Sequence, residues 1–376
     1  MSKLYDILSF YVPGGMLLAC GVMFLFTFIP DSALLGNYRK ARYAMACAYS
    51  FFFVVNVVEY LFGGLPGQDI YLMQTFTLIV AASQALLFTF AMLALVDVRF
   101  PGWWYIFREA TPVLLFIAVV FTVYSCCSEE FFTVAFYGFA GIYALLLVRY
   151  TVLFVASYRR FRYRMDNYYC DEEAGRLRWV VFSFFSALAI GVLALLSAVF
   201  MSTLVALIFA IVFDVFYIFF AIRFINYAYQ FRAIERAMDN SAPEETAFPA
   251  NKMPVAENNT KAAHTTFAAL EKQLELWVAN KGFTEQRITI DTLAARLCTN
   301  NKYLSTYINT RKKQTFREWI NELRIEEAQS LLLQSPGLKM NEIADKTGFL
   351  DKSHFLRQFK KLNKQSPTAW KNRIRT

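Results

Sequence analysis

Long apolar runs with almost no charge constrain this chain more than any other feature of its sequence. Seven of them follow one another in the first 228 residues, and each is close to the ~20 apolar residues that a helix needs to cross a bilayer. We place them at 8–29, 43–62, 70–96, 111–127, 131–157, 178–200 and 203–228. Because backbone polar groups find no water inside lipid, such spans must be helical. The sequence therefore predicts an all-α fold that begins with a polytopic bundle of seven membrane helices.

Turn residues or charges separate most of these runs. Pro30-Asp31, Gly63-Gly64, Pro101-Gly102 and Glu129-Glu130 each lie between two spans. The boundary between the sixth and seventh spans is the weakest, because its sequence FMSTL carries no charge. Six spans with one long re-entrant hairpin are the alternative at that point.

The loops between the spans differ sharply in positive charge. The loops that follow even-numbered spans contain no Lys or Arg, whereas those that follow odd-numbered spans contain Arg39, Lys40, Arg42, Arg99, Arg108, Arg159, Arg160, Arg162, Arg164, Arg176 and Arg178. Loops rich in Lys and Arg stay on the cytoplasmic side of a membrane. We therefore expect the N-terminus outside and the C-terminus in the cytoplasm.

Composition differs between the first 228 residues and the last third of the chain. The whole chain is 57% hydrophobic, above the ~45–50% of ordinary soluble domains, and residues 1–228 hold nearly all of the excess. Residues 262–376 contain 20 Lys and Arg against 11 Asp and Glu, a net charge of +9, which is the net charge of the whole chain. A basic balance confined to one small domain is typical of a partner with many negative charges. A basic domain that is merely soluble explains the charge equally well.

We divide the chain into three parts: a membrane domain at 1–228, a helical stalk and flexible linker at 229–264, and a helical domain at 265–376. The linker prediction rests on a polar, proline-bearing stretch without periodicity at 240–262. The last part opens with an apolar stripe at helical spacing, Phe267, Leu270, Leu274, Trp277 and Val278. We expect Gly282 to end that helix as its left-handed residue.

An approximate internal repeat fills most of the third part. Residues 290–316 and 340–367 each read as a short helix, a turn and a second helix, and the second copy has one more residue in its turn. Thr299 and Asp351 are the candidate N-caps of the two second helices. The residues expected to be buried correspond between the copies: Ala294 with Ala344, Leu304 with Phe355, and Ile308 with Phe359.

With those residues inward, each second helix turns a polar face outward. Its side chains are of the kinds that bond to base edges and phosphates. The candidate DNA-binding residues are Lys302, Ser305, Thr306, Asn309, Lys352, Ser353, Leu356, Arg357 and Lys360.

A long helix joins the two copies and is stopped by Ser335-Pro336-Gly337. This helix and the second copy together contain a long, specific pattern: Arg324, Ile325, Ala328, Leu331, Leu332, Ile343, Ala344, Gly348, Phe349, Asp351, Phe355, Phe359, Lys360, Lys361, Ser366 and Pro367. In these residues the segment from 265 to 376 resembles the DNA-binding module of AraC-type (arabinose-regulator) transcription factors.

The resemblance implies two helix-turn-helix units joined by a rigid helix, with each second helix entering one of two successive major grooves on one face of double-stranded DNA. The family usually has a glycine just after each recognition helix, where this chain has Lys313 and Lys364. An adapted turn with a small loss of stability is one explanation of these lysines, and two additional phosphate contacts are the other.

A few polar residues interrupt the predicted spans, where such groups are costly. Asp214 can pair with Arg149 or with a tyrosine hydroxyl between helices, which would be a structural role. Glu59, Asn56 and Gln74 can instead form an outward-open pocket for a polar ligand. All five are therefore candidate ligand-binding residues.

The sequence contains no motif for catalysis, metal binding or a cofactor. It has two histidines, six cysteines without metal-ligand spacing, and no nucleotide-binding loop. We therefore expect no enzyme, no metal and no cofactor. The residues favour a membrane-embedded, sequence-specific DNA-binding transcriptional regulator that senses an external or membrane signal. The alternatives are a passive membrane-anchored transcription factor, and a transporter or receptor with an appended DNA-binding domain.

The resemblance and the spans together imply a place and a set of partners. We expect a multi-pass protein of the bacterial inner membrane whose DNA-binding domain lies in the cytoplasm. Its expected partners are double-stranded DNA, the lipid bilayer, a small-molecule or membrane signal, a second copy of the chain, and RNA polymerase if the regulator is an activator.

Overall fold

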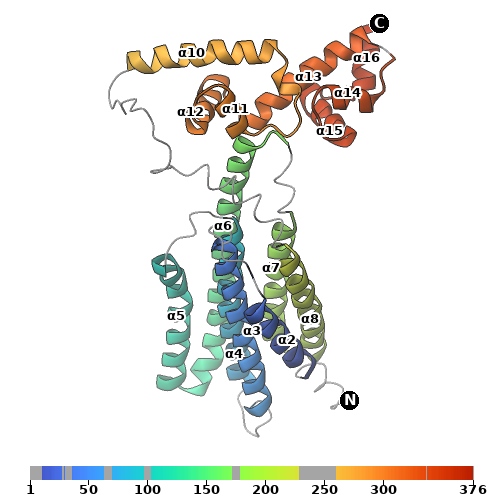
Figure 1. The fold of residues 1–376 in the computed structure, drawn as a ribbon. Helices are drawn as coiled ribbons and strands as arrows, with labels where there is room; N and C mark the ends of the chain where they lie inside the picture. Colours follow the sequence, from blue (N-terminus) through green and yellow to red (C-terminus); the bar gives the residue numbers. More distant parts are fainter. Residues whose placement is uncertain are drawn as a thin grey trace. The chain divides into compact units, whose positions relative to one another are not determined.

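The computed structural model describes residues 11–27, 29, 36–62, 70–96, 103–171, 178–227, 260–335 and 337–375. The regular elements in these ranges are helices, joined by a single isolated β-bridge between Tyr169 and Thr289. This confirms the all-α prediction. Contacts divide the chain into two compact units, shown in Figure 1. Unit 1 comprises 1–161 and 176–236, and unit 2 comprises 162–175 and 237–376.

Unit 1 is a bundle of apolar helices. They are α2 (Val12–Phe26), α3 (Gly36–Phe62), α4 (Ile70–Val96), α5 (Trp103–Cys126), the first part of α6 (Glu129–Tyr168), α7 (Arg178–Phe200) and α8 (Thr203–Asn226). Among the described residues, the six helices from α3 to α8 are long and apolar enough to cross a membrane, and α2 is a shorter apolar helix. The first predicted span, 8–29, includes residues outside the described ranges, so the seventh crossing stays a prediction.

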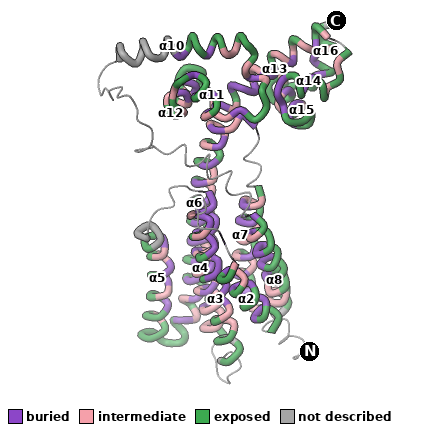
Figure 2. The backbone as a smooth tube through the Cα atoms, viewed as in Figure 1, coloured by how far each residue is buried: buried purple, intermediate pink, exposed green. Residues whose placement is uncertain are grey.

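Helix α4 is the most enclosed helix of unit 1. Its most apolar window is 72% buried, against 22–39% for the other five long helices. It packs against α3, α5 and α7, and one apolar cluster joins it to α5 and α6. The outer helices instead leave large apolar side chains exposed, among them Leu145, Val148 and Val152 of α6. Figure 2 colours much of α5 and α8 as exposed. Exposed apolar side chains in such number suit a hydrocarbon solvent.

Tyrosines link the helices of unit 1 through backbone carbonyls. The hydroxyls of Tyr38 and Tyr49, both on α3, donate to the carbonyl oxygens of Phe224 and Tyr217 on α8 at 2.6 and 2.7 Å. Each bond satisfies a buried hydroxyl, which would otherwise be costly in an apolar interior. The weak boundary between the sixth and seventh predicted spans is a genuine helix end, because α7 stops at Phe200 and Met201 has φ 50°.

Three helices differ clearly from the predicted spans. Helix α3 begins at Gly36 rather than near 43, α5 begins at Trp103 rather than near 111, and α6 ends at Tyr168 rather than near 157. The apolar pattern ends where the polar residues begin, but a helix continues through Arg, Tyr and Met, which are compatible with it. Residues 162–171, which include the last turns of α6 and the three residues that follow it, belong to unit 2. We call this segment the α6 tail.

Unit 2 adds a set of mostly short helices to the α6 tail. They are α10 (Thr260–Ala279), the 3-10 turn η4 (Gly282–Thr284), α11 (Ile290–Arg296), α12 (Asn301–Tyr307), the π-helical turn η5 (Ile308–Lys312), α13 (Phe316–Gln334), α14 (Met340–Lys346), α15 (Lys352–Asn363) and α16 (Pro367–Arg375). Most of the predicted stalk and linker, 229–264, lies outside the described residues. Helix α10 begins at Thr260, ahead of the predicted domain start at 265.

The end of α10 differs from the prediction by one residue. The left-handed residue is Lys281, with φ 55°, and not Gly282. Gly282 is required for another reason, since a Cβ atom there would lie 2.2 Å from Nε1 of Trp277. The glycine therefore permits close packing and does not supply the left-handed turn.

Candidate nucleic-acid interface

Helix α13 is the shared support of the two helix-turn-helix units. A capping box begins it, in which the Thr315 hydroxyl accepts from the Glu318 amide at 3.3 Å and the Glu318 carboxylate accepts from the Thr315 amide at 3.0 Å. The linking helix predicted at 315–334 is confirmed, with Thr315 as its N-cap and Gln334 as its last residue. One of its faces is fully buried at Phe316, Ile320 and Ala328.

The second helix-turn-helix unit, α14 and α15, closes over a compact aromatic core. Phe349, Phe355 and Phe359 are all fully buried, and Trp370 of α16 packs against Phe359. This cluster also includes Ala328 and Leu332 of α13, residues that the sequence had matched to the family pattern. The inward positions predicted for Phe355 and Phe359 are confirmed.

The first helix-turn-helix unit, α11 and α12, buries the corresponding positions. Leu304 and Ile308 are at most 1% exposed, and Ala294 is 3% exposed. The turns of the two units close with the same bond, from the Thr299 amide to the Ala294 carbonyl and from the Phe349 amide to the Ala344 carbonyl, both at 2.9 Å. The internal repeat seen in the sequence is therefore a structural repeat.

The two second helices begin with different caps. The Asp351 carboxylate accepts from the His354 amide at 2.7 Å, as predicted. The prediction of Thr299 for the first unit is wrong, because Asn300 caps α12 and accepts from the Tyr303 amide at 2.7 Å. Asn and Thr both favour the N-cap position, so residue type alone could not distinguish two adjacent candidates.

The candidate DNA-binding residues lie on the outer faces of α12, η5 and α15. In the first unit, Lys302 and Thr306 are exposed, and the half-buried pair Ser305 and Asn309 is joined by a hydrogen bond of 3.2 Å. In the second unit, the exposed residues are Lys352, Ser353, Arg357 and Lys360. Leu356 is half-buried and packs against the aromatic core, so it contributes to the support of α15 as well as to its surface.

Both faces carry positive charge without any acidic residue. The ranges 301–313 and 352–364 contain no Asp or Glu. Their exposed cations are Lys302, Arg311, Lys312, Lys313, Lys352, Arg357, Lys360, Lys361 and Lys364. Helix α15 is also strongly amphipathic, with its aromatic core residues opposite its cations. Such a face can attract phosphates and place polar side chains against base edges.

The lysines after the two recognition helices occupy glycine-like backbone positions. Lys313 has φ 55° and Lys364 has φ 61°, both in the left-handed region. This left-handed conformation is the one that favours the glycine usual in the family at these two positions. Both lysines are exposed, so the left-handed conformation leaves their ammonium groups at the surface.

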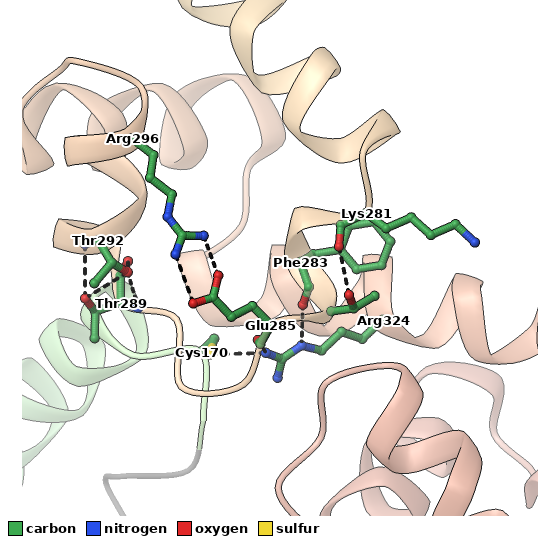
Figure 3. Close-up of polar contacts among 9 residues, drawn as sticks. Cys170, Lys281, Phe283, Glu285, Thr289, Thr292, Arg296 and Arg324 are labelled. Carbon is green, nitrogen blue, oxygen red and sulfur yellow. Dashed lines mark hydrogen bonds and ion pairs between the residues drawn. The ribbon is translucent and has the colours of Figure 1, made fainter.

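Arg324 of α13 is the most deeply buried charged residue of unit 2 among those described. Its side chain is 0% exposed, and its guanidinium donates to the carbonyls of Phe283 and Glu285 at 2.9 and 2.7 Å (Figure 3). The same guanidinium reaches the α6 tail, at Oδ1 of Asp171 at 3.3 Å and Sγ of Cys170 at 3.6 Å. Arg324 therefore joins α13, the η4 turn and the α6 tail.

Two further side-chain contacts attach the α6 tail to the first helix-turn-helix unit and the start of α13, and a third bond continues the first of them. The Tyr168 hydroxyl donates to the Asp291 carboxylate at 2.6 Å, and the other oxygen of that carboxylate accepts from the Asn301 amide side chain at 2.9 Å. Arg317 forms an ion pair with Asp166 at 2.9 Å. A relay of hydrogen bonds thus runs from the tail to the first residue of α12.

Sequence reasoning missed the α6 tail as part of the site. The available signal was Arg324, which matches the family pattern, because an arginine that is buried in a helix needs polar or acidic partners. Cys170 is not a reactive group in this place. Burial raises the pKa of its thiol to about 12, and although Arg324 lowers it, the thiol stays protonated at neutral pH.

The candidate ligand residues of unit 1 are not brought to one place. Asn56 and Gln74 line the same cavity, whereas Asp214 and Arg149 are not among its lining residues. Arg149 pairs with Glu109 of α5 and not with Asp214, which corrects the suggested partner. An oxygen of the buried Asp214 has no hydrogen-bond partner among the described residues. The side chain of Glu59 lies outside what the structure describes.

Comparison with known proteins supports the assignment of the C-terminal region. Residues 293–373 match a family described as "Helix-turn-helix domain". Over 100 residues the chain is 29% identical to the "Uncharacterized HTH-type transcriptional regulator YijO" of Escherichia coli strain K12, a stretch that covers 26% of this chain and 35% of that protein. The chain thus spans about a third of the length of this relative. No solved structure matches the chain. The C-terminal region is a helix-turn-helix domain.

Proposed function

We propose that this protein is a membrane-embedded transcriptional regulator of the AraC type that binds specific sequences in double-stranded DNA. The observation that carries the proposal is the pair of helix-turn-helix units on α13, each of which presents an exposed helix with cations and no acidic residue. Two such helices on one support suit successive major grooves on one face of the duplex. The named relative is also a transcriptional regulator.

The six long apolar helices support a membrane location for unit 1. The distribution of Lys and Arg between the loops supports an orientation in which the helix-turn-helix domain lies on the cytoplasmic side of a bacterial inner membrane. Reporter fusions after Gly64 and Asn240 test this orientation. We expect the first to report the outside and the second the cytoplasm, and the reverse result would overturn it.

We further propose that the protein is a sensor and not a passive anchor. The α6 tail follows a helix of unit 1 in the chain, and it is attached to α13 and to the first helix-turn-helix unit by Arg324, Arg317 and Asp291. A change in that helix would therefore alter the contacts that hold the first unit. An anchor needs a single span and no such contacts.

The DNA-binding proposal is tested with the full-length chain in nanodiscs. A DNA ligand is selected from a random library, and its dissociation constant is measured by fluorescence anisotropy against competitor DNA at several salt concentrations. We expect a sequence preference and an affinity that falls as salt rises, because phosphate contacts release counterions. Binding that shows no preference for any sequence would refute the proposal.

Single substitutions locate the interface. We expect Lys302→Ala and Arg357→Ala each to weaken specific binding by about tenfold, as expected for the loss of a phosphate or base contact. Lys272→Ala, which removes an exposed lysine from α10, serves as the matched control and should leave the affinity unchanged. If all three variants behave alike, the contact face lies elsewhere.

A further inference from the structure

A cavity of about 290 Å³ lies inside unit 1, lined by residues of α2, α3, α4, α6, α7 and α8. This volume is at the lower end of the range of ~300–1,000 Å³ that is usual for small-molecule sites. None of the residues that line it is charged. Six phenylalanines contribute to its wall: Phe52, Phe76, Phe88, Phe184, Phe209 and Phe213.

Several polar residues of the cavity wall already have partners. The Tyr143 hydroxyl donates to the Gly191 carbonyl at 3.0 Å. The hydroxyls of Thr77 and Thr151 donate to carbonyls one turn earlier in their own helices, at 3.2 and 2.8 Å. These groups shape the wall but need nothing further from a bound molecule.

Two other polar groups of the wall lack a partner. Gln84 of α4 is 7% exposed and Tyr150 of α6 is 2% exposed. Neither Nε2 of Gln84 nor the Tyr150 hydroxyl makes a hydrogen bond with any described residue. The Gln84 amide interacts with the Tyr217 phenol, but no hydrogen bond of normal geometry joins its Nε2 to that oxygen. Because buried polar groups in native proteins are nearly always partnered, these two donors indicate a missing acceptor.

We propose that this cavity binds an uncharged, mainly aromatic molecule with a carbonyl oxygen, and that this molecule is the signal of the sensor; the inference rests on the proposed function. Phenylalanine walls favour a flat unsaturated ring system. The carbonyl oxygen accepts from Gln84 Nε2 or the Tyr150 hydroxyl. A carboxylate or an ammonium group is excluded because the wall offers no countercharge, and an unpaired charge is strongly disfavoured there.

The binding test uses three probes with the same ring system. They are 1-acetylnaphthalene, which carries a carbonyl acceptor, 1-ethylnaphthalene, which has none, and 1-naphthoate, which is charged. Binding to the full-length chain in nanodiscs is measured by equilibrium dialysis, and uptake by empty nanodiscs is subtracted. We expect saturable binding of the ketone that is roughly fivefold tighter than that of the hydrocarbon, the value of one hydrogen bond. We expect no binding of naphthoate.

Variants connect the binding to the cavity. The double variant Gln84→Leu/Tyr150→Phe, which removes both donors, should abolish the preference for the ketone over the hydrocarbon. Ala210→Phe fills the cavity and should abolish binding of both, whereas Ile211→Phe changes the next residue of α8, which is 49% exposed and does not line the cavity, and should leave binding intact. Equal uptake by all variants, saturable binding of naphthoate, or uptake that empty nanodiscs match would overturn the proposal.

The same samples separate this inference from the proposed function. The helical circular dichroism of each variant and its thermal unfolding, compared with those of the unaltered chain, report that unit 1 has folded. If the chain binds the ketone but prefers no DNA sequence, the proposed regulator function is refuted and the proposed ligand site is supported. If it binds DNA selectively but its binding of the ketone does not saturate, the ligand site is refuted and the regulator function is supported. We expect saturating ketone to change the affinity for DNA, and an unchanged affinity would refute its role as the signal.

Discussion

The two helix-turn-helix units follow one sequence pattern but are stabilised in different ways. The second unit has its own aromatic core, built from Phe349, Phe355 and Phe359 and closed by Trp370 of α16. The recognition helix of the first helix-turn-helix unit ends in the π-helical turn η5, and the Asp291 carboxylate of this unit accepts a hydrogen bond from Tyr168 of the α6 tail. The second unit is thus supported by helices that are near it in the sequence, whereas the first also depends on a segment that lies far away.

The left-handed residue of each turn shows the same difference. In the second unit it is Gly348, with φ 86°, and in the first it is Cys298, with φ 51°. A Cβ atom on Gly348 would lie 2.4 Å from the Thr284 carbonyl oxygen, while Cys298 is exposed and already carries one. The second turn is packed tightly against η4, and the first turn is open. This asymmetry makes the first unit the better candidate for regulation.

The largest change in local stability is expected from adding one methyl group to the turn of the second helix-turn-helix unit. Gly348→Ala should lower the local free energy of opening of α14 and α15 by about 3 kcal/mol, from a steric clash and the cost of a left-handed alanine. The matched variant Cys298→Ala should change the local free energy of opening of α11 and α12 by less than about 0.5 kcal/mol, since it removes only an exposed thiol. Hydrogen exchange of the full-length chain measures both.

Equal loss of protection in the two variants would contradict the difference between the turns. Gly348→Ala also provides a check on the DNA proposal. It should remove the contacts of α15 while α12 remains folded, so that the footprint on DNA shrinks from two major grooves to one.

A smaller effect is expected from breaking the contact between the α6 tail and α13. Asp171→Asn removes the carboxylate from the fully buried Arg324, whose two carbonyl acceptors remain. We expect the local free energy of opening to fall by about 2 kcal/mol, the value of a hydrogen bond between charged groups. Protection should fall in the tail, at the Cys170 amide that bonds to the Ile288 carbonyl, and in α11, but not in α15.

Asp166→Asn is the control for this prediction. Its partner Arg317 also belongs to α13, but this ion pair is partly exposed, with side chains 11% and 24% accessible, so its loss should change stability by less than about 1 kcal/mol. A larger effect from Asp166 than from Asp171 would show that the surface pair, and not the buried arginine, attaches the tail. Loss of protection in α15 with either variant would remove the distinction between the units.

The sequence predicted those parts of the fold that depend on periodicity. Leu304, Ile308, Phe355 and Phe359 recur at helical spacing, and such spacing determines which face of a short helix is buried. The extent of α13 could be predicted as well, because the Ser335 stop is a local signal. These features require only neighbouring residues, and the structure confirms them.

Features that depend on distant contacts could not be predicted. Asn300 replaces Thr299 as the cap because the path of the turn decides which side chain reaches the Tyr303 amide. Lys281, and not Gly282, is left-handed, and the glycine is instead required by the indole of Trp277, which lies far enough away in the helix that the turn signal alone does not reveal it. The partner of Arg324 lies in the α6 tail, more than a hundred residues earlier, and no spacing rule connects the two.

The smallest effect is expected at the lysines that follow the recognition helices. Lys313 and Lys364 adopt left-handed conformations that cost a side-chain-bearing residue about 1 kcal/mol relative to glycine, although glycine loses part of that advantage through its greater freedom in the unfolded chain. Lys313→Gly and Lys364→Gly should therefore stabilise their units by a few tenths of a kcal/mol. Hydrogen exchange measures this change, and anisotropy measures the DNA affinity of the same variants. If the turn alone explains these lysines, the affinity stays constant, and its salt dependence does too. A weaker affinity with a shallower salt dependence in one variant would instead assign a phosphate contact to that unit, and would show which of the two units binds the DNA backbone more strongly.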